Sequence, residues 1–391
     1  MPVASSVQEA MTRGSFIRKM FEQGKELERL HGAENVFDFT LGNPVLEPPA
    51  ELFEALREIS SRRGEGLHRY MTNAGFSHVR EAVAAMLARE FPGITGDHIV
   101  MTTGAAGAVN IVLKTLLSPG DEVVVLVPYF PEYSFYIRNH GGVPVLCQTG
   151  PDFDLDIDAL ARAITPRTRA LLIDSPNNPS GRIYPRASLE ALGRLLAERE
   201  AAIGHPIYLI SDEPYREIVY IDDPPPSPAT FHPHSFQVYS WSKSLSIAGD
   251  RIGYAAVNPR CEDAGALFDG LVFANRTLGF INAPATMQLA VARVLSLRPD
   301  VAWYRARRDL LVRGLRDIGL DVTAPEGTFY LFPRTPEPDE MPFIERAVSE
   351  RVLLVPGSGF GRAGHFRLSY TATDRAIEGG LAALARVLGR G

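Results

Sequence analysis

The sequence predicts an α/β fold built on a largely parallel sheet. Short apolar runs alternate along the chain with stretches whose apolar residues recur at helical spacing, as in strands joined by helical crossovers. The runs are continuous Val, Ile and Leu segments such as residues 122–127, which is typical of strands buried on both faces. An apolar fraction of 45% with 22% charged residues is that of an ordinary globular protein.

The elements of this sheet follow one another in order. Apolar runs predict strands at residues 98–104, 122–127, 143–148, 169–174, 207–211, 236–240 and 251–257. Stretches of helical periodicity predict helices at residues 76–89, 104–117, 131–139, 156–164 and 187–201. Ser118-Pro119-Gly120 closes the second of these helices, because proline and glycine cannot continue it.

The pattern changes beyond about residue 285. Arg-rich helical stretches at 290–297 and 301–318 lead into short strands at 328–332, 353–356 and 365–370, and a helix at 374–388 ends the chain. We therefore expect a large domain at 51–285 and a smaller α+β domain at 286–391. Residues 1–50 are expected to form an N-terminal arm and part of the small domain.

Composition excludes several classes of protein. Apolar runs such as 123–127 are far shorter than the roughly 20 residues of a membrane-spanning helix. The first residues contain neither a basic nor an apolar signal segment, and two cysteines cannot build a disulfide framework. A net charge of −6 argues against a dedicated nucleic-acid binder. We expect a cytoplasmic enzyme with no membrane or nucleic-acid partner, and His and Cys show no metal-ligand spacing.

Polar segments follow the predicted strands at the edge where open α/β sheets bind ligands. Residues 103–107 (TGAAG) lie between a strand and a helix, where backbone N–H groups can hold a phosphate. Residues 175–181 (SPNNPSG) and 211–215 (SDEPY) follow two further strands, and residues 240–244 (SWSKS) contain Lys243. These four segments predict one binding site for a phosphorylated ligand beside a lysine.

The segments occur with others in a family order. LGNP (41–44), Tyr70, TTGAAG, PYF (128–130), NNPSG, SDEPY, SxSK, GDRIGY (249–254) and FRLS (366–369) run from Leu41 to Tyr370. In this series the chain resembles the pyridoxal-phosphate-dependent aminotransferases of class I/II, fold type I, which include aspartate and aromatic aminotransferases. The resemblance implies a mostly parallel seven-stranded sheet flanked by helices, with a smaller α+β domain.

The resemblance also implies roles for the catalytic residues. Lys243 would form a Schiff base with the pyridoxal 5′-phosphate aldehyde and then shuttle the substrate proton. Asp212 would keep the pyridine nitrogen protonated so that the ring can accept electrons. Asn178 and Tyr215 would bind the ring oxygen O3′, and Phe130 would stack on the ring.

The remaining implied contacts are to the phosphate and the substrate. Gly104, Ala105, Ala106, Ser240, Arg251 and, from the other subunit, Tyr70 would hold the phosphate. Arg suits this work because its planar fork pairs bidentately with phosphate. Ala105 and Ala106 replace residues that often contribute side chains in relatives, so backbone donors would act there. Arg367 would clamp the substrate α-carboxylate near Gly42 and Asn178.

Transamination is the leading hypothesis: an L-amino acid donates its amino group and a 2-oxo acid accepts it in a ping-pong scheme. Another pyridoxal-phosphate reaction on an amino acid, such as β-elimination or a specialised oxidation or cyclisation, is the alternative. Arg276 is a candidate contact for an acidic substrate side chain, whereas Phe16, Ile17, Phe329 and Tyr330 could line an apolar pocket. If Tyr70 completes a neighbour's site, the protein is a homodimer with shared active sites.

Overall fold

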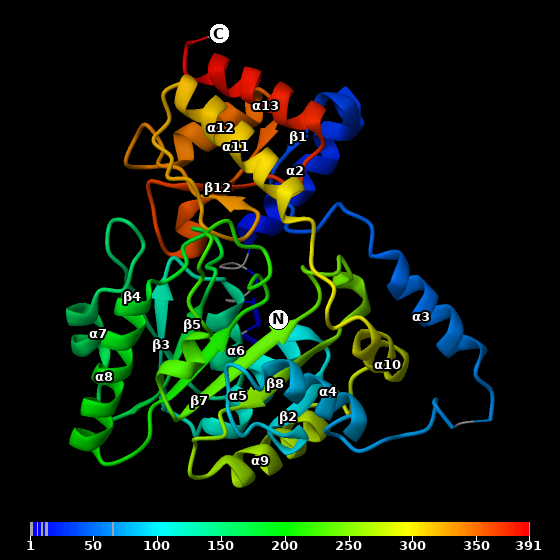
Figure 1. Cartoon of the computed structure of the whole chain (residues 1–391). Coiled ribbons are helices and arrows are strands. Elements are labelled where there is room, and N and C mark those ends of the chain that lie inside the picture. Colours follow the sequence, from blue (N-terminus) through cyan, green and yellow to red (C-terminus); the bar gives the residue numbers. More distant parts are fainter. Residues whose placement is uncertain (1–2, 6, 9–10, 12–14, 65, 391) are drawn as a thin grey trace.

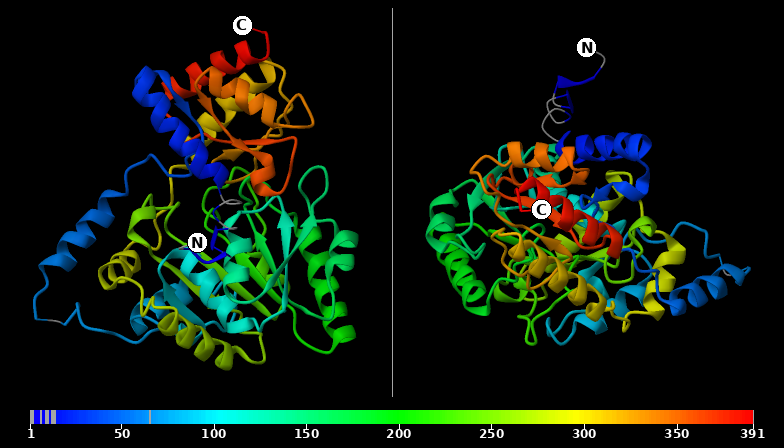
Figure 2. Two further views of the ribbon diagram at one scale, coloured as in Figure 1. Left: turned by 180° about the vertical axis from the view of Figure 1, so that it is seen from behind. Right: turned by 90° about the horizontal axis from the view of Figure 1, so that it is seen from above.

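The computed structural model describes residues 3–5, 7–8, 11, 15–64 and 66–390. Figure 1 shows a broad lower part around the large sheet and a smaller upper part that contains the C-terminal helices and helix α2 (Ser15–His31). The views from behind and above in Figure 2 show α3 (Ala50–Ser61) standing out at one side of the molecule. The two ends of the sequence therefore contribute to the same upper part.

The large sheet has seven strands in the order β2-β8-β7-β6-β5-β3-β4. Their bounds are β2 (Ile99–Thr102), β3 (Glu122–Val127), β4 (Val143–Gln148), β5 (Thr168–Asp174), β6 (Tyr208–Asp212), β7 (Ser235–Ser240) and β8 (Gly253–Val257). β8 pairs antiparallel with β2 and β7, and the other neighbours pair parallel. The predicted α/β fold with a mostly parallel sheet is confirmed.

The central strands are buried on both faces, and alternate side chains enter different hydrophobic clusters. Val123 and Val125 of β3 face one cluster with helices α5 (Gly104–Leu116) and α9 (Ala264–Thr277). Val124 and Leu126 face a second cluster with α7 (Ile157–Ala163) and α8 (Arg186–Ile203). Successive side chains of a strand point to opposite faces of the sheet. Because both faces are buried here, every residue of β3 after Glu122 is apolar.

The other helices of the large part are α4 (Ser77–Leu87), α6 (Glu132–Asn139) and α10 (Ala285–Arg293). The sequence predicts this last helix at 290–297. In the structure α10 begins directly after Pro284 and ends at Arg293, so the predicted start is five residues too late. Helices α2, α3, α9 and α12 (Met341–Ser349) were not predicted. In α9, Gly265 and Gly270 weaken the helical signal, but Gly270 allows close packing: a Cβ there would lie 2.6 Å from Thr115 Cγ2.

The upper part brings the two ends of the chain together. β1 (Phe37–Asp38) pairs parallel with β10 (Val352–Leu353), and β12 (Phe366–Ser369) lies between β11 (Val355–Pro356) and β9 (Tyr330–Leu331) in an antiparallel sheet. α11 (Val301–Asp317), α12 and α13 (Asp374–Val387) cover these strands and bury one cluster that extends from Phe39 to Leu384. The expected pairing of the N-terminal residues with the C-terminal third is thus a direct strand contact.

Short 3₁₀ helices also occur among the described residues: η1 (Ala33–Asn35), η2 (Gly96–His98), η3 (Pro228–Phe231), η4 (Ala248–Asp250) and η5 (Gly357–Phe360). β5, β6 and β7 end at Asp174, Asp212 and Ser240, at one edge of the sheet beneath the upper part. Because these strands run parallel, the segments that follow them meet at that edge. Within the described residues, no helix has both the length and the apolar character needed to cross a membrane.

Candidate active site

A cavity of about 630 Å³ lies at the carboxyl edge of the large sheet. Its walls come from both parts of the molecule, since Gly42 and Arg367 lie opposite the ends of β5, β6 and β7. Most of the residues predicted for the site line it: Gly42, Ala105, Ala106, Phe130, Asn178, Asp212, Tyr215, Ser240, Lys243, Arg251 and Arg367. The structure therefore gathers into one place residues that the sequence distributes over 326 positions, from 42 to 367.

Lys243 occupies the turn that follows β7. Its Nζ donates a hydrogen bond to the carbonyl of Gly42 at 2.6 Å and lies 5.6 Å from the centroid of the Phe329 ring. Burial, together with the nearby charges of Arg367 and Arg251, lowers the pKa of Lys243 to about 8. At pH 7 about a tenth of the amine is therefore neutral and can act as a nucleophile or a base.

Asp212 is the last residue of β6 and is buried. Tyr133 of α6 donates a hydrogen bond to its Oδ2 at 2.7 Å, whereas Oδ1 has no partner in the part of the chain that the structure describes. The pKa of Asp212 is raised to about 7. Burial is the main cause, the charge of Glu213 raises the pKa as well, and the hydrogen bond from Tyr133 lowers it. A buried carboxyl with one free oxygen in a cavity is suited to a cationic or N–H partner.

A second carboxyl lies beside Asp212. Asp174 ends β5, and the two residues are register partners on neighbouring parallel strands. Asp174 Oδ2 accepts a hydrogen bond from the backbone N–H of Asn178 at 2.9 Å, and Oδ1 has no partner. The sequence reading assigned no role to Asp174, although its place at the end of the strand at 169–174 was the signal that could have found it.

Arg367 and the aromatic residues around it form the wall opposite the sheet. The Arg367 Nη1 atom donates to Asn178 Oδ1 at 3.1 Å, Nη2 donates to the Thr40 carbonyl at 2.9 Å, and Nε has no partner. The guanidinium lies 4.4 Å from the centroid of the Tyr330 ring. The Tyr330 and Tyr215 hydroxyls are 3.1 Å apart. A cation fixed by neutral groups is free to bind a carboxylate.

The opposite end of the cavity is suited to an anion. Helix α5 begins at Gly104, which has a φ of +80° and whose added Cβ would lie 2.8 Å from Arg251 Nη2. Arg251 is held in place because Nη1 donates to the Ala248 carbonyl at 2.9 Å and Nη2 donates to the Thr103 carbonyl at 3.3 Å. The start of α5, Ser240 and this guanidinium line the same cavity, and N–H groups at a helix start together with a guanidinium are suited to an anion.

These features fit pyridoxal phosphate. An anion site at one end, an unpartnered buried carboxylate oxygen on Asp212 and the low-pKa amine of Lys243 match its phosphate, ring nitrogen and aldehyde in charge and chemistry. Phe130 lines the same cavity and contacts Tyr133 edge to face, with ring centroids 5.4 Å apart. A flat aromatic wall beside a carboxylate is what a pyridine ring requires.

Some residues expected at the site lie elsewhere in this chain. Tyr70 lies in the segment between α3 and α4, and it is 91% exposed. Arg276, near the end of α9, is exposed and lies over the Phe273 ring at 5.4 Å. Tyr330 lines the cavity, but Phe329 is in the core of the upper part. The side chains of Phe16 and Ile17 lie outside the described part of the structure.

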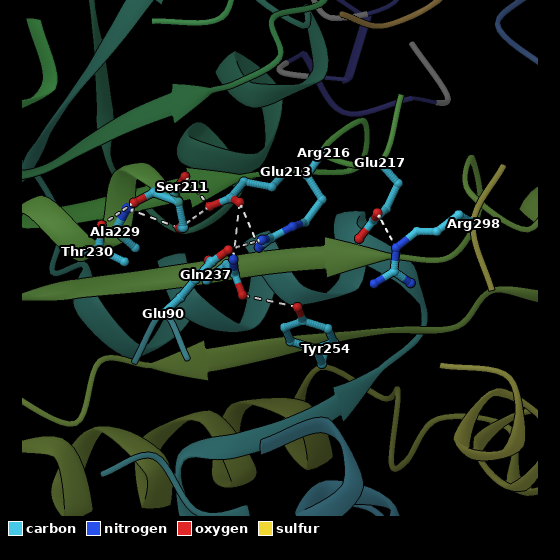
Figure 3. A network of polar contacts seen from close by, with 11 residues as sticks. Glu90, Ser211, Glu213, Arg216, Glu217, Ala229, Thr230, Gln237, Tyr254 and Arg298 are labelled. Carbon is cyan, nitrogen blue, oxygen red and sulfur yellow. Dashed lines mark hydrogen bonds and ion pairs between the residues drawn. The ribbon is translucent and has the colours of Figure 1, made fainter. Parts of the chain in front are cut away.

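A polar network supports the turn that follows β6 (Figure 3). Glu213 accepts hydrogen bonds from Ser211 at 2.7 Å and Gln237 at 3.1 Å, and Arg216 bridges it to Glu90. Burial raises the pKa of Glu213, and the Arg216 charge counteracts that rise. Asp212 lines the cavity, whereas Glu213 is not among the lining residues and is bound by these partners.

A Glu-His cluster lies at the other edge of the sheet, where β6 and β7 begin. His232 Nε2 and His234 Nδ1 lie 3.1 and 2.8 Å from Glu200 Oε1, which also accepts the N–H of Ile207 at 2.8 Å. The sequence shows no metal-ligand spacing, and the structure brings together these three side chains, of which Glu200 and His234 lie 34 positions apart in the chain. The hydrogen bonds to Glu200 explain why these side chains lie together, since they connect α8 to the segments before β6 and β7.

The model of the family "Aminotransferase class I and II" matches residues 34–384. The chain is 36% identical to the aspartate/prephenate aminotransferase of Thermus thermophilus, and the match covers 94% of each protein. It superposes on an aminotransferase from Eubacterium rectale with a TM-score of 0.95 at 35% identity, covering 100% of this chain and 99% of that one. The aspartate aminotransferase of Thermus thermophilus, solved with maleate, gives a TM-score of 0.87 at 32% identity, covering 99% and 100%.

Proposed function

Because the chain belongs to the class I and II aminotransferases, we propose that it transfers the amino group of L-amino acids with uncharged side chains to 2-oxo acids. The transfer depends on pyridoxal phosphate, the cofactor of this family. The fold type I scaffold and the amino-group transfer expected from the sequence are confirmed by these relatives. The proposal concerns the substrate and the residues that act on it.

When bound, pyridoxal phosphate withdraws electrons from the bonds at the substrate Cα and so makes the Cα proton acidic. We assign the binding of its phosphate to the first N–H groups of α5 at Gly104, Ala105 and Ala106, with Ser240 and Arg251. Asp212 would hold the proton of the ring nitrogen, Phe130 would cover one ring face, and Asn178 and Tyr215 would bind the ring oxygen. All but Gly104 line the cavity, and Gly104 opens the helix at its edge.

Lys243 would attach to the cofactor and, once released by the incoming substrate, act as the base. Its neutral Nζ would accept and hold the proton of the substrate Cα. The pKa of about 8 supports both tasks, because the amine is neither fully protonated nor too weak a base. The hydrogen bond to the Gly42 carbonyl keeps the amine inside the cavity before the cofactor enters.

Arg367 would bind the substrate α-carboxylate. Its Nε is unpartnered and buried, and Asn178 and Thr40 fix the rest of the guanidinium through 3.1 and 2.9 Å hydrogen bonds. A planar guanidinium held in this way can pair with both oxygens of a carboxylate. The substrate would thereby be oriented with its Cα near Lys243.

The preference for uncharged side chains rests on Glu132. This carboxyl lines the cavity, and its Oε2 has no hydrogen-bond partner among the described residues. Burial raises its pKa, and the nearby charge of Arg367 acts against that rise. The remaining side-chain wall is aromatic, with Tyr133, Tyr136 and Tyr330. The cavity's cations are Lys243, Arg251 and Arg367, and each already has a role above. An acidic side chain would therefore meet a carboxyl and no free cation from the described part of this chain.

A homodimer with shared sites is the proposed assembly. Tyr70 is 91% exposed and away from its own cavity, as expected of a residue that completes the phosphate site of a partner subunit. Leu41, Val45, Phe53 and Phe273 are also exposed apolar side chains. Exposed apolar groups of this kind are often covered by a second subunit.

We propose a cytoplasmic location, in keeping with two cysteines that are both buried and unpaired. The proposed domains are an arm and part of the small domain at 1–50, a large domain from residue 51 and a C-terminal small domain. The sequence places the boundary at 285. α10 packs with α3 and α4 in a cluster of the large part, so we count it with the large domain.

The experiment is a half-reaction screen. Purified holoenzyme is mixed with single L-amino acids, without a 2-oxo acid, and the loss of the visible absorbance of the bound cofactor is followed over one turnover. We expect leucine and phenylalanine to react with a higher second-order rate constant than aspartate. A higher rate constant for aspartate would overturn the side-chain preference, and release of ammonia instead of retention of the amino group would overturn transamination.

A further inference from the structure

The ends of β5 and β6 place two buried carboxyls side by side. Asp174 and Asp212 are register partners in a parallel pair, so their side chains emerge on the same face about 5 Å apart at the backbone. Each is only 5% exposed, and both line the cavity. Two carboxylates in such a place repel each other strongly unless a proton or a cation lies between them.

The hydrogen bonds of the pair are asymmetric. Asp212 Oδ2 accepts the Tyr133 hydroxyl proton at 2.7 Å, and Asp174 Oδ2 accepts the Asn178 N–H at 2.9 Å. The other oxygen of each residue, Oδ1, is buried and unpartnered. Among the described residues, no ion pair includes either carboxyl. One donor each is too few to stabilise two buried negative charges.

Among the residues that the structure describes, no other charge neutralises the pair. The titratable groups that act electrostatically on one of the two carboxyls, or are acted on by them, are Tyr133, Tyr136, Tyr184, Tyr215, Tyr330 and Glu213. The tyrosines are neutral, and Glu213 is paired with Arg216. Lys243, Arg251 and Arg367 line the cavity but bond to other groups. Burial raises the pKa of both Asp174 and Asp212.

We propose that Asp174 and Asp212 act as one unit that holds a single proton, and that Asp174 is a positioning residue for the Asp212 carboxylate. With one shared proton the pair carries one negative charge, which balances the single positive charge of a protonated ring nitrogen. The inference rests on the proposed function, because it takes Asp212 to face that nitrogen. It assigns a role to Asp174, which has none in the proposed function.

The first test uses the cofactor-free, full-length protein. Infrared spectra with isotope-labelled aspartate carboxyls, recorded against pH, report how many aspartates are protonated. We expect the wild type to retain a protonated aspartate to near neutral pH. In Asp174→Asn, Asp212 should titrate at least about one pH unit lower, since its charged neighbour is gone. The exposed Asp158→Asn serves as the control and should leave the titration unchanged. Titration of Asp212 at the same pH in the wild type and Asp174→Asn would overturn the proposal.

The second test separates this inference from the assignment of Asp212. Affinities are measured for pyridoxal phosphate and for its analogue in which carbon replaces the ring nitrogen. In the wild type, the affinity ratio of cofactor to analogue should rise about tenfold with pH through the titration of the pair, because a second negative charge then favours the cation. In Asp174→Asn, the ratio should stay constant there. An equal rise in both proteins would contradict the role of Asp174, whereas a ratio near one throughout would contradict the placement of Asp212 at the nitrogen.

Discussion

Arg367 Nη1 lies 3.1 Å from Asn178 Oδ1, although 189 residues separate the two along the chain. Arg367 belongs to β12 in the upper part, and Asn178 follows β5 in the lower part. This contact therefore joins the two parts across the cavity. It also fixes the guanidinium without neutralising it, so that the remaining N–H groups can bind a substrate carboxylate.

Replacement of Arg367 by Ala should lower kcat/KM for every amino-acid donor by about 10- to 100-fold, as expected for the loss of hydrogen bonds to a charged group. Steady-state kinetics measures it. Cofactor affinity should stay within about threefold of the wild type, because Arg367 is assigned to the substrate. Arg367→Lys should restore part of the loss, and full activity of the Ala variant would exclude the clamp.

The pKa of Lys243 predicts a pH dependence for cofactor capture. The rate at which the cofactor-free protein binds pyridoxal phosphate covalently should rise up to tenfold per pH unit below about pH 8 and level off above it, because the neutral amine is the nucleophile. Stopped-flow absorbance measures this rate. Lys243→Ala should fold normally yet show no covalent capture at any pH. If the capture rate did not change between pH 6 and pH 8, the pKa of Lys243 could not be about 8.

Asp212 predicts a change of stability with pH. Its pKa is about 7 in the folded protein against an ordinary value of 3.8, so the folded state binds more protons between these values and loses stability as pH rises through them. Asp212→Asn removes this loss. Relative to the wild type, the cofactor-free variant should gain on the order of 4 kcal/mol in free energy of unfolding between pH 4 and pH 8. Urea denaturation at both pH values measures this gain. A gain of the same size in Asp158→Asn would show that the effect is not specific.

Glu132 predicts a change in substrate preference. Glu132→Gln removes the carboxyl that an acidic side chain would meet, so kcat/KM for aspartate should rise by about tenfold, as for the removal of one repulsive contact of about 1.4 kcal/mol. The value for leucine should stay within about twofold. Competition between the two donors in one reaction gives the ratio directly. An unchanged ratio would remove Glu132 from the specificity argument.

Tyr70 tests the shared site. Tyr70 is 91% exposed in the single chain, and Tyr70→Phe deletes only its hydroxyl. The variant should therefore have the same free energy of unfolding as the wild type. If the hydroxyl binds a partner's phosphate group, the variant should bind pyridoxal phosphate about 10- to 100-fold more weakly. Equilibrium dialysis gives the affinity, and sedimentation gives the state of assembly. Undiminished cofactor affinity in a dimeric variant would rule out this contact.

Much of the site follows from local sequence. The segments with Asn178, Asp212 and Lys243 were recognised because each follows an apolar run, and parallel strands end at a common edge. Gly104 was recognised because it stands between a strand and a helix. Such features depend on neighbouring residues alone, so they are readable without the fold.

Other members of the site depend on register and on distant packing. Asp174 lies beside Asp212 only because β5 and β6 pair with these two residues opposite each other. Tyr133 reaches Asp212 from a helix 79 residues earlier, and Glu132 enters the cavity from the same helix. No local periodicity encodes these contacts, since they result from the packing of whole elements.

By itself, the sequence determined the alternation of strands and helices, the edge of the sheet at which the site lies, and the family order of its motifs. Only the tertiary structure decided which side chains face one another there: the Asp174–Asp212 pair, the free oxygen of Glu132, and the exposure of Tyr70. The physical reason is that strand order and turn chemistry are local, whereas register, burial and desolvation arise from contacts between segments far apart in the chain.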